Sequence, residues 1–413
     1  MSGQQWKRLD VLERLDAGKL TVGESAQVLG LSRRQMQRLR QRVAKLGSDG
    51  VLHGNTGRAP RNRLTKRLRG RILGLARKKY LGFNDQHLTE KLVEVEGLTV
   101  SRVTVRRLLR EAGVAAVRKR RPPKHRRRRD RKAQSGLMIL WDASRHDWME
   151  GRGPMLCLMG AIDDATGEVL PGAHFVDQEC SAGYLRVLCA IVEEKGIPCS
   201  AYMDRHGSLR RNDDHWTLEE ELRGEQDLTQ VGRALRALDV EVIFALSPQA
   251  KGRVERLWGT LQDRLTSELR LAKARTLEQA NTVLAAHRHD HNRRFTVAAA
   301  DTTPAWRAVR AGLDVARACG FYYEATVHND NTVRLDGQII DIPPGPRERS
   351  YARARVEVRQ FLDGSWHVYH RDHRIATRTA TVLNEVRARK RRKRPAASRA
   401  FRKAIEAISP SLP

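Results

Sequence analysis

Residues 137–142 read LMILWD, an apolar run that ends in an acid and is typical of a buried β-strand. Two further strands are expected within residues 155–176, around a turn at Asp163–Gly167. Beyond them the pattern predicts, in order, a helix near 181–195, a strand at 200–204, a helix around 228–238, a strand at 240–245 and a long helix from Arg253 to about Leu271. Strands that come first and then alternate with helices predict a mixed α/β sheet, and we assign this core to residues 136–312.

The N-terminal segment, residues 1–50, predicts a helix-turn-helix DNA-binding domain. Thr21 and Glu24 form a T-x-x-E capping box that starts the second helix, and Gly30 makes the turn before the third. The third helix should bury Met36 and Leu39 and present on its outer face Arg33, Arg34, Gln37 and Arg38. Arg and Gln suit base edges and phosphates, which favours a recognition helix over the alternative, a plain three-helix bundle with a polar face.

A second helix-turn-helix domain is predicted at residues 60–115, because three more helical stretches follow the loop His53–Arg61. The third stretch starts at about Ser101 and should turn outward Arg102, Arg106, Arg107 and Arg110. Two such domains in tandem favour a long DNA site over a short one.

Residues 320–382 alternate with a period of two and predict five short strands. The pairs Asp336–Gly337 and Asp363–Gly364 are typical hairpin turns, so we expect a small, SH3-like β-barrel. The remaining segments, residues 116–135 and 383–413, are expected to be a basic linker and a basic tail.

The charge of the chain favours a polyanionic partner. Lys and Arg number 78 against 48 Asp and Glu, a net charge of +30. Residues 136–310 hold 22 bases and 26 acids, net −4, so the rest of the chain carries +34. The runs Arg118–Lys132 and Arg387–Arg394 concentrate this charge. Solvated tails are the alternative, but between DNA-binding domains such runs favour contact with DNA phosphates.

Several other classes of protein are not supported by the sequence. No apolar run approaches the ~18 residues of a membrane span, and the N-terminus lacks the apolar region of a signal peptide, so we expect a cytoplasmic, nucleoid-associated protein without membrane contact. The five cysteines show no zinc-site spacing and should be small buried residues. The segment HRHDH predicts a solvated helix end; a metal site formed by His287, His289 and His291 is the alternative.

Three acids of the core are placed to act together. Asp142 ends the first strand, Asp204 ends a later one, and Glu255 lies early on the long helix, in a polar stripe with Lys251 and Trp258. Carboxylates that gather in this way repel one another, and a divalent cation such as Mg²⁺ or Mn²⁺ relieves the repulsion. Two such ions would support the in-line displacement of a phosphodiester, with Lys251 as a contact for DNA.

Other acids compete with this assignment. Some lie in an acidic insertion, residues 212–227, where no strand end or packed helix face positions them. Others lie in a predicted hairpin turn, where Asp is common for local reasons. We rank below the triad Asp147, Asp163, Asp164, Asp213, Asp214 and Glu219–Glu221.

Four segments of the core carry a resemblance: LMILWDASRHDWMEGRGP, GAIDDATGEV, YMDRHGS and SPQAKGRVERLWGTLQDRL. They resemble the catalytic core of DDE transposases with a retroviral-integrase-like fold, and more narrowly bacterial insertion-sequence transposases of the ISNCY group. The resemblance extends from about Arg8 to Ala380 and implies an RNase H-like core whose metal-binding triad is Asp142, Asp204 and Glu255. A longer gap between the last two acids and the lack of a zinc-binding N-terminal module are departures from retroviral integrases.

The sequence therefore predicts a Mg²⁺- or Mn²⁺-dependent DNA transposase with two ions in each active site. It would bind the terminal repeats of its own element and cut and join strands there. Because two ends must be brought together, it would act as a homo-oligomer of at least two subunits. Two alternatives stay open: a non-catalytic DNA-binding transcriptional regulator, and a structure-selective nuclease on the same core.

Overall fold

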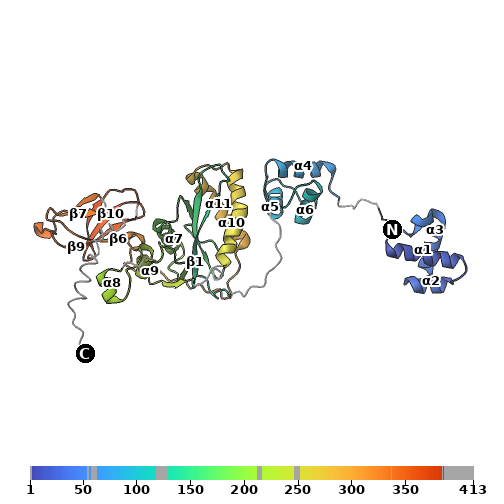
Figure 1. Cartoon of the computed structure of the whole chain (residues 1–413), viewed down its shortest axis with the longest axis horizontal. Helices are drawn as coiled ribbons and strands as arrows, with labels where there is room; N and C mark the ends of the chain where they lie inside the picture. Colours follow the sequence, from blue (N-terminus) through green and yellow to red (C-terminus); the bar gives the residue numbers. More distant parts are fainter. Residues whose placement is uncertain are drawn as a thin grey trace, which may run out of the picture. The chain divides into compact units, whose positions relative to one another are not determined.

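The computed structural model describes residues 2–53, 55–56, 63–117, 129–211, 216–245, 252–335, 337–383 and 385 (Figure 1). The chain divides into two compact units, residues 1–71 and 72–413, and each is described by itself. Several predicted features lie outside the described residues: Lys251, Asp213, Asp214, the run Arg387–Arg394 and the part of the run Arg118–Lys132 before Arg129.

The first unit contains the three predicted helices α1 (Gly3–Asp16), α2 (Val22–Leu29) and α3 (Arg33–Leu46), followed by the short helix η1 (Gly47–Val51). The capping box of α2 is confirmed: the backbone N–H of Glu24 donates to Thr21 Oγ1, and the Glu24 carboxylate accepts the backbone N–H of Thr21 at 2.7 Å. Gly30 ends α2 in the left-handed region, with φ of 63°. The side chains that form the core of this unit are Val11, Leu12, Leu15, Ala26, Met36, Leu39 and Val51.

The next helices are α4 (Lys66–Arg77), α5 (Asp85–Glu94) and α6 (Arg102–Glu111), close to the predicted ranges. As expected, α6 buries Val105, Leu108 and Leu109. The outward position predicted for Arg110 is wrong. Its guanidinium donates to both carboxylate oxygens of Asp85, at 2.9 and 2.7 Å, and thereby ties α6 to the start of α5.

Charged side chains join α5 to the core helix α10 (Gly252–Leu271). Arg264 donates to both carboxylate oxygens of Glu90, at 2.7 and 3.1 Å, and its side chain is only 6% exposed. One turn further along α10, the Glu268 carboxylate lies 2.6 Å from His87 Nε2 and accepts a hydrogen bond from Lys91 Nζ at 2.9 Å. The hydrogen bonds of Arg264 and Glu268 therefore fix the second half of α10 against α5.

The core is a mixed sheet, as predicted. Its strands are β1 (Ile139–His146), β2 (Leu156–Asp163), β3 (His174–Val176), β4 (Ser200–Met203) and β5 (Glu241–Phe244), in the order β3-β2-β1-β4-β5. β1 pairs antiparallel with β2 and parallel with β4, which in turn pairs parallel with β5. The helices α7 (Ser181–Glu194) and α9 (Gln230–Ala237) cover one face, whereas α10 and α11 (Leu277–Phe295) cover the other (Figure 1).

Side chains of β1 alternate between these two faces. Ile139 and Trp141 join the apolar cluster under α7 and α9. Leu140 joins the other cluster, under α10 and α11. Because successive side chains on a strand point to opposite faces, Asp142 lies on the α10 side.

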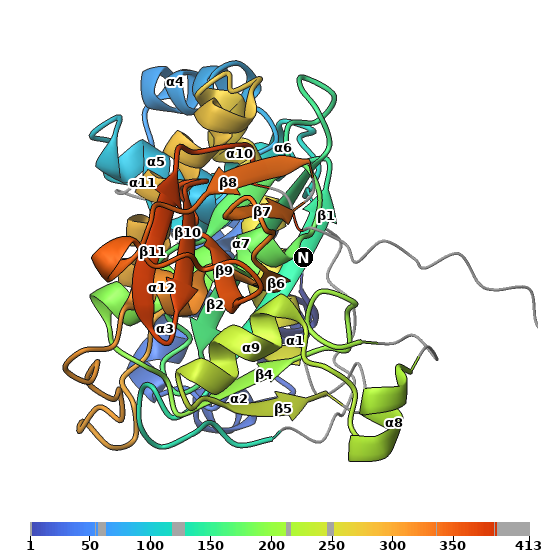
Figure 2. The ribbon, with the colours of Figure 1, turned by 90° about the vertical axis from the view of Figure 1, so that its left-hand side faces the viewer.

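The described part of the C-terminal region has six strands rather than the five predicted. After α12 (Val315–Cys319) come β6 (Phe321–Thr326), β7 (Thr332–Leu335), β8 (Gln338–Asp341), η3 (Pro346–Glu348), β9 (Arg355–Gln360), β10 (Trp366–His370) and β11 (His373–Arg378). Figure 2 shows β11, β10 and β9 side by side; with β6 they form one sheet, and β7 and β8 form a second. The strand β11 was missed because its hairpin turn, Arg371–Asp372, adopts positive φ without a glycine.

The prediction of a solvated helix end at HRHDH is wrong. These residues lie within α11, and the spacing of Ala280, Leu284, His287 and His291 forms its inward stripe, because residues three or four apart share a helix face. His287 and His291 are 6% and 4% exposed, and only His289 of the three faces outward. The acidic insertion also contains a helix that the sequence did not predict, α8 (Leu218–Arg223).

The five cysteines are all free thiols, and Cys157 and Cys319 are buried as expected, whereas the other three are only partly buried. None of the helices in the described part of the chain combines the length and the apolar character needed to span a bilayer.

Candidate active site

The register of two parallel strands places Asp142 level with Asp204. Ile139 pairs with Ala201 and Leu140 with Tyr202, an offset of 62 residues that also separates the two aspartates. Asp204 comes directly after β4, so the register continues to it within two residues. Neighbouring strands lie roughly 4.8 Å apart, which makes these two acids adjacent on one face of the sheet. The prediction that Asp142 ends the first strand is wrong: antiparallel pairing with β2 continues β1 to His146, so Asp142 lies in the middle of its strand and only Asp204 follows a strand end.

The helix α10 holds one of the two carboxylates directly. Trp258 Nε1 donates a hydrogen bond of 2.8 Å to Asp142 Oδ2. One turn later, Gln262 Nε2 donates to Ser144 Oγ at 3.3 Å, two residues further along β1. The predicted polar stripe of α10 therefore faces β1, although Trp258 itself is buried and belongs to the apolar cluster.

A glycine leaves the space that Trp258 occupies. Gly160 on β2 pairs with Asp142, and a Cβ atom there would lie 3.8 Å from the indole ring and 3.3 Å from the Cβ atom of Ala173. Any larger side chain at residue 160 would meet both neighbours. The missing side chain thus allows the indole to lie across the sheet and reach the carboxylate.

The third predicted acid, Glu255, is exposed and lies three residues before Trp258 in the first turn of α10. It therefore starts the stripe that continues through Trp258 and Gln262. Within the part of the chain that the structure describes, no three His, Cys, Asp or Glu side chains are already grouped closely enough to hold a metal ion. The structure brings Asp142 and Asp204 together in register, and it does not bring Glu255 into contact with them.

A fourth acid, Glu179, lies near the two aspartates and was missed by the sequence interpretation. Its carboxylate accepts a hydrogen bond of 2.6 Å from Tyr184 Oη and lies 3.0 Å from His206 Nδ1. The backbone N–H of His206 donates to Asp204 Oδ1 at 3.0 Å. The sequence offered only a weak indication of this role: Glu179 lies shortly after a strand, in the short segment before α7.

The electrostatic effect of these acids is visible at Tyr184. Burial and then the nearby charges of Glu179, Asp204 and Asp142 raise the pKa of the Tyr184 hydroxyl above its usual value. Burial, with a smaller contribution from Glu179, raises the pKa of the Cys157 thiol to about 11. Negative charge is thus concentrated between the middle of β1 and the end of β4, and neither Tyr184 nor Cys157 ionises to add to it.

The competing acids mostly have local structural partners. Asp147 Oδ1 accepts the backbone N–H of Gly151 at 3.0 Å and closes a turn. Glu220 is buried and accepts the backbone N–H groups of Thr217 and Asp227, at 2.8 and 2.7 Å, which organises the insertion around α8. Asp163 and Asp164 are fully buried, and they differ in their partners, as described below.

The side chains expected to contact DNA are exposed where the structure describes them. On α3 these are Arg33, Arg34, Gln37 and Arg38, and on α6 they are Arg102 and Arg106. They lie on the faces opposite the buried side chains of their helices.

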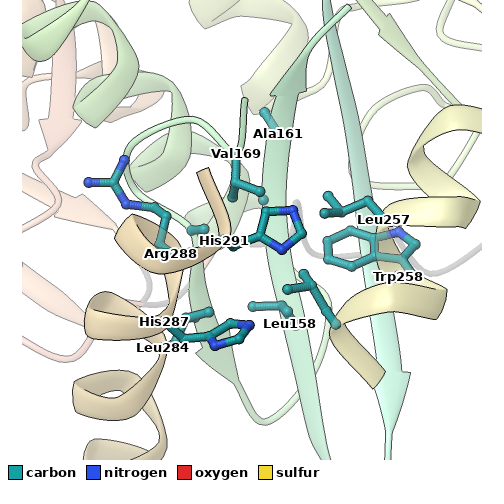
Figure 3. Close-up of a pocket in the computed structure, with 12 residues that line it drawn as sticks. Leu158, Ala161, Val169, Leu257, Trp258, Leu284, His287, Arg288 and His291 are labelled. Atoms are coloured by element: carbon teal, nitrogen blue, oxygen red, sulfur yellow. The ribbon is translucent and has the colours of Figure 1, made fainter. Parts of the chain in front are cut away.

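A small pocket lies behind Trp258, between β2, α10 and α11 (Figure 3). His287 and His291 project into it from α11, beside Leu158 and Trp258. Each imidazole has one nitrogen, Nε2 of His287 and Nδ1 of His291, that is buried without a hydrogen-bond partner. Burial lowers the pKa of both side chains to about 4, so both histidines are neutral at physiological pH.

No family model matches the chain. It is 33% identical over 379 residues to the putative transposase y4bF of Sinorhizobium fredii (strain NBRC 101917 / NGR234), covering 92% of this chain and 81% of that protein. It is 32% identical over 334 residues to the transposase for insertion sequence IS1202 of Streptococcus pneumoniae, covering 70% of this chain and 68% of the relative.

Two solved structures are similar to the chain at low scores. One is the intasome of simian T-cell lymphotropic virus in complex with the PP2A regulatory subunit B56 gamma, at 12% identity and a TM-score of 0.31, covering 76% of this chain and 100% of the matched chain. The other is the HTLV-2 integrase catalytic core domain in complex with magnesium, at 16% identity and a TM-score of 0.25, covering 37% of this chain and 85% of that chain.

Proposed function

Because this chain belongs to the transposases, enzymes that cleave DNA strands and transfer them to new positions, we propose that Asp142, Asp204 and Glu255 carry this reaction. The observation that supports the proposal most is the shared register of Asp142, in the middle of β1, and Asp204, directly after β4, on the face covered by α10. Glu255 is the acid that the same helix carries on the stripe facing β1.

The donor set is suited to Mg²⁺ or Mn²⁺. Carboxylate oxygens are the ligands that these hard cations prefer. Burial, then Glu179 and to a smaller extent Asp204 and Asp142, raise the pKa of Tyr184, which indicates that the three acids lie close enough to act on one group. Asp142, Asp204 and Glu255 would hold two ions, which when bound would stabilise charge on the attacking and leaving oxygens of the phosphodiester.

The other residues of the site orient these acids. The Trp258 indole fixes the rotation of the Asp142 carboxylate, and the backbone of His206 does the same for Asp204. The apolar cluster beneath Trp258 keeps water from the inner side of the site. The protein thus supplies two oriented carboxylates, whose role would be to hold the cations that stabilise the developing negative charge of the phosphodiester.

We further propose that the α1–α3 and α4–α6 segments are helix-turn-helix DNA-binding domains that bind the terminal repeats of the element. Their exposed Arg and Gln side chains, on α3 and α6, support base and phosphate contacts. Lys251 would contact DNA beside Glu255. The C-terminal strands would form an SH3-like domain, and two or more subunits would hold both ends of the element.

The experiment that tests the proposal uses purified full-length protein and labelled DNA that ends in the terminal repeats flanking the gene. With Mg²⁺ we expect both shortened strands and longer, joined products, and neither should form in EDTA. Shortened strands alone would favour the structure-selective nuclease. Binding without any product would favour the transcriptional regulator.

Sequence preference should reside in the exposed face of α3. Gln37→Ala or Arg38→Ala should relax discrimination at one or two base pairs by about 1–3 kcal/mol, because a bidentate base contact would be lost. Competition binding with single-base variants of the terminal repeat measures this effect.

Lys45→Ala, in the last turn of α3, is the matched control, and it should lower affinity for all sequences equally. An equal loss for all sequences with Gln37→Ala and Arg38→Ala as well would reduce both to phosphate contacts.

A further inference from the structure

Asp164 is a buried acid whose partners come from two distant segments of the chain. It follows β2 and is fully buried. Arg129 donates to both of its carboxylate oxygens, at 2.6 and 3.1 Å, and the backbone N–H of Lys132 donates to Oδ2 at 2.8 Å. The Arg253 guanidinium also donates to this carboxylate.

One of these partners belongs to the helix that carries Glu255. Arg253 lies in the first turn of α10, two residues before Glu255. Its guanidinium also donates to the backbone carbonyl of Arg129 at 2.5 Å. The carboxylate of Asp164 and the end of the basic linker therefore meet at the start of α10.

The helix dipole makes this contact important for the first turn of α10. The N-terminus of a helix carries partial positive charge, so a cation there is unfavourable and an anion is favourable. Arg253 places a cation in that turn, and Asp164 compensates it from outside the helix. The arginines keep Asp164 ionised: although burial opposes ionisation, Arg129, Lys132 and Arg253 together lower its pKa.

The neighbouring residue, Asp163, is equally buried, but its hydrogen-bond partners are Gly136, just before β1, and Thr166, in the turn after β2. Its carboxylate accepts the backbone N–H of Gly136 at 2.8 Å and both the N–H and the hydroxyl of Thr166 at 2.9 Å. It closes the turn after β2 and makes no contact with α10. The two adjacent acids thus have separate roles.

We propose that Asp164 is a positioning residue: through Arg253 it fixes the first turn of α10, and with it Glu255, and through Arg129 and Lys132 it holds the end of the basic linker at the same place. The inference rests on the proposed role of Glu255. It assigns to Asp164 no contact with DNA or with the reacting atoms.

The test compares Asp164→Asn with the matched control Asp163→Asn in the full-length protein. In Asp164→Asn the hydrogen-exchange protection factors of the amides in residues 252–258 should fall at least tenfold. Those of residues 261–271 should not change. In the same variant, strand cleavage at saturating DNA should fall about tenfold or more, with the affinity for element ends unchanged. Asp163→Asn should leave exchange in 252–258 as in the wild type.

A second variant removes the other half of the contact. Arg253→Gln keeps Asp164 paired with Arg129, so it should fold, and it should produce the same local loss of protection. Unchanged exchange at 252–258 in both variants would overturn the inference. Cleavage at the wild-type rate in Asp164→Asn, together with an inactive Glu255→Gln, would overturn it as well while leaving the proposed function intact. An active Glu255→Gln would instead refute the proposed function, and the exchange data would still decide whether Asp164 anchors α10.

Discussion

Asp142→Asn, Asp204→Asn and Glu255→Gln should each abolish both strand cleavage and strand joining, a loss of about a thousandfold or more. Each substitution keeps the size of the side chain and removes a negative charge that the bound cations require. Cleavage and joining should be lost together, because the two reactions share one set of carboxylates and differ only in the attacking oxygen. Sizing of labelled products measures both in one assay.

Binding of the element ends should survive in all three variants, since it is assigned to the helical segments. Two controls are matched in chemistry: Glu241→Gln, an exposed acid on the neighbouring strand β5, and Asp213→Asn in the acidic insertion. Both should keep activity near that of the wild type. If Glu255→Gln still joined strands while an insertion variant did not, the third acid would be wrongly assigned. Residual cleavage in all three triad variants would refute the proposed site.

Mild acid should destabilise the core because of His287 and His291. Their pKa is about 4 in the folded protein, against 6.5 ordinarily, so the folded state favours the neutral form. Above pH 6.5 both histidines are neutral in the folded and the unfolded protein, so the folded state keeps its full stability. As the pH falls from 6.5 toward 4, the unfolded chain binds protons that the folded protein does not, and stability is lost. At pH 5 each histidine should lower the free energy of unfolding by about 2 kcal/mol, relative to its value at neutral pH.

The charged neighbours of the pair determine the pH window. Glu268 and Asp290 favour protonation of His287, whereas Arg264 opposes that of His291. The pKa of Glu268 and that of Asp290 are both about 2, so these acids lose their own contribution only below about pH 4.5. Between about pH 7.5 and pH 5 the change in stability should therefore come mainly from His287 and His291, with a smaller part from His174, whose pKa burial also lowers.

Urea unfolding of the full-length protein, followed by tryptophan fluorescence at several pH values, measures this dependence. His287→Leu and His291→Leu should each flatten it. His289→Leu, an exposed neighbour on α11, should leave it unchanged and serves as the matched control. If the free energy of unfolding of both His287→Leu and His291→Leu still fell with pH as steeply as that of the wild type, other groups would account for the loss of stability in acid.

Local sequence patterns were sufficient to predict most elements. Thr21 with Glu24, and Ser32 with Gln35, interact within one turn, so their capping boxes follow from the sequence alone. The run at 137–142 and the strand ending at Asp204 are short apolar segments, and their positions needed no knowledge of the rest of the chain. Both apolar runs end in an acid, so the first two candidate site residues followed from the same pattern, although β1 itself continues past Asp142 to His146.

Features that depend on packing were missed or misread. Glu179 is linked to Asp204 through His206, a contact between segments that the sequence does not pair. The inward stripe of α11 was present in the spacing of Leu284, His287 and His291, but a histidine-rich segment read in isolation resembles a solvated one. The partners of Asp164 are 32 to 89 residues away in the chain, so a turn seemed a sufficient explanation for it.

The continuity of α10 has a mechanical consequence. Its 20 residues span about 30 Å without interruption. One end carries Glu255, and the other half is held to α5 by the bonds of Arg264 and Glu268. Because the first half of the same helix is bonded to β1 through Trp258 and Gln262, α10 is a rigid strut that keeps α5 at a fixed distance from the carboxylates of the sheet. If the α4–α6 segment binds the element end as proposed, the length of this one helix sets the distance between the bound DNA and those carboxylates.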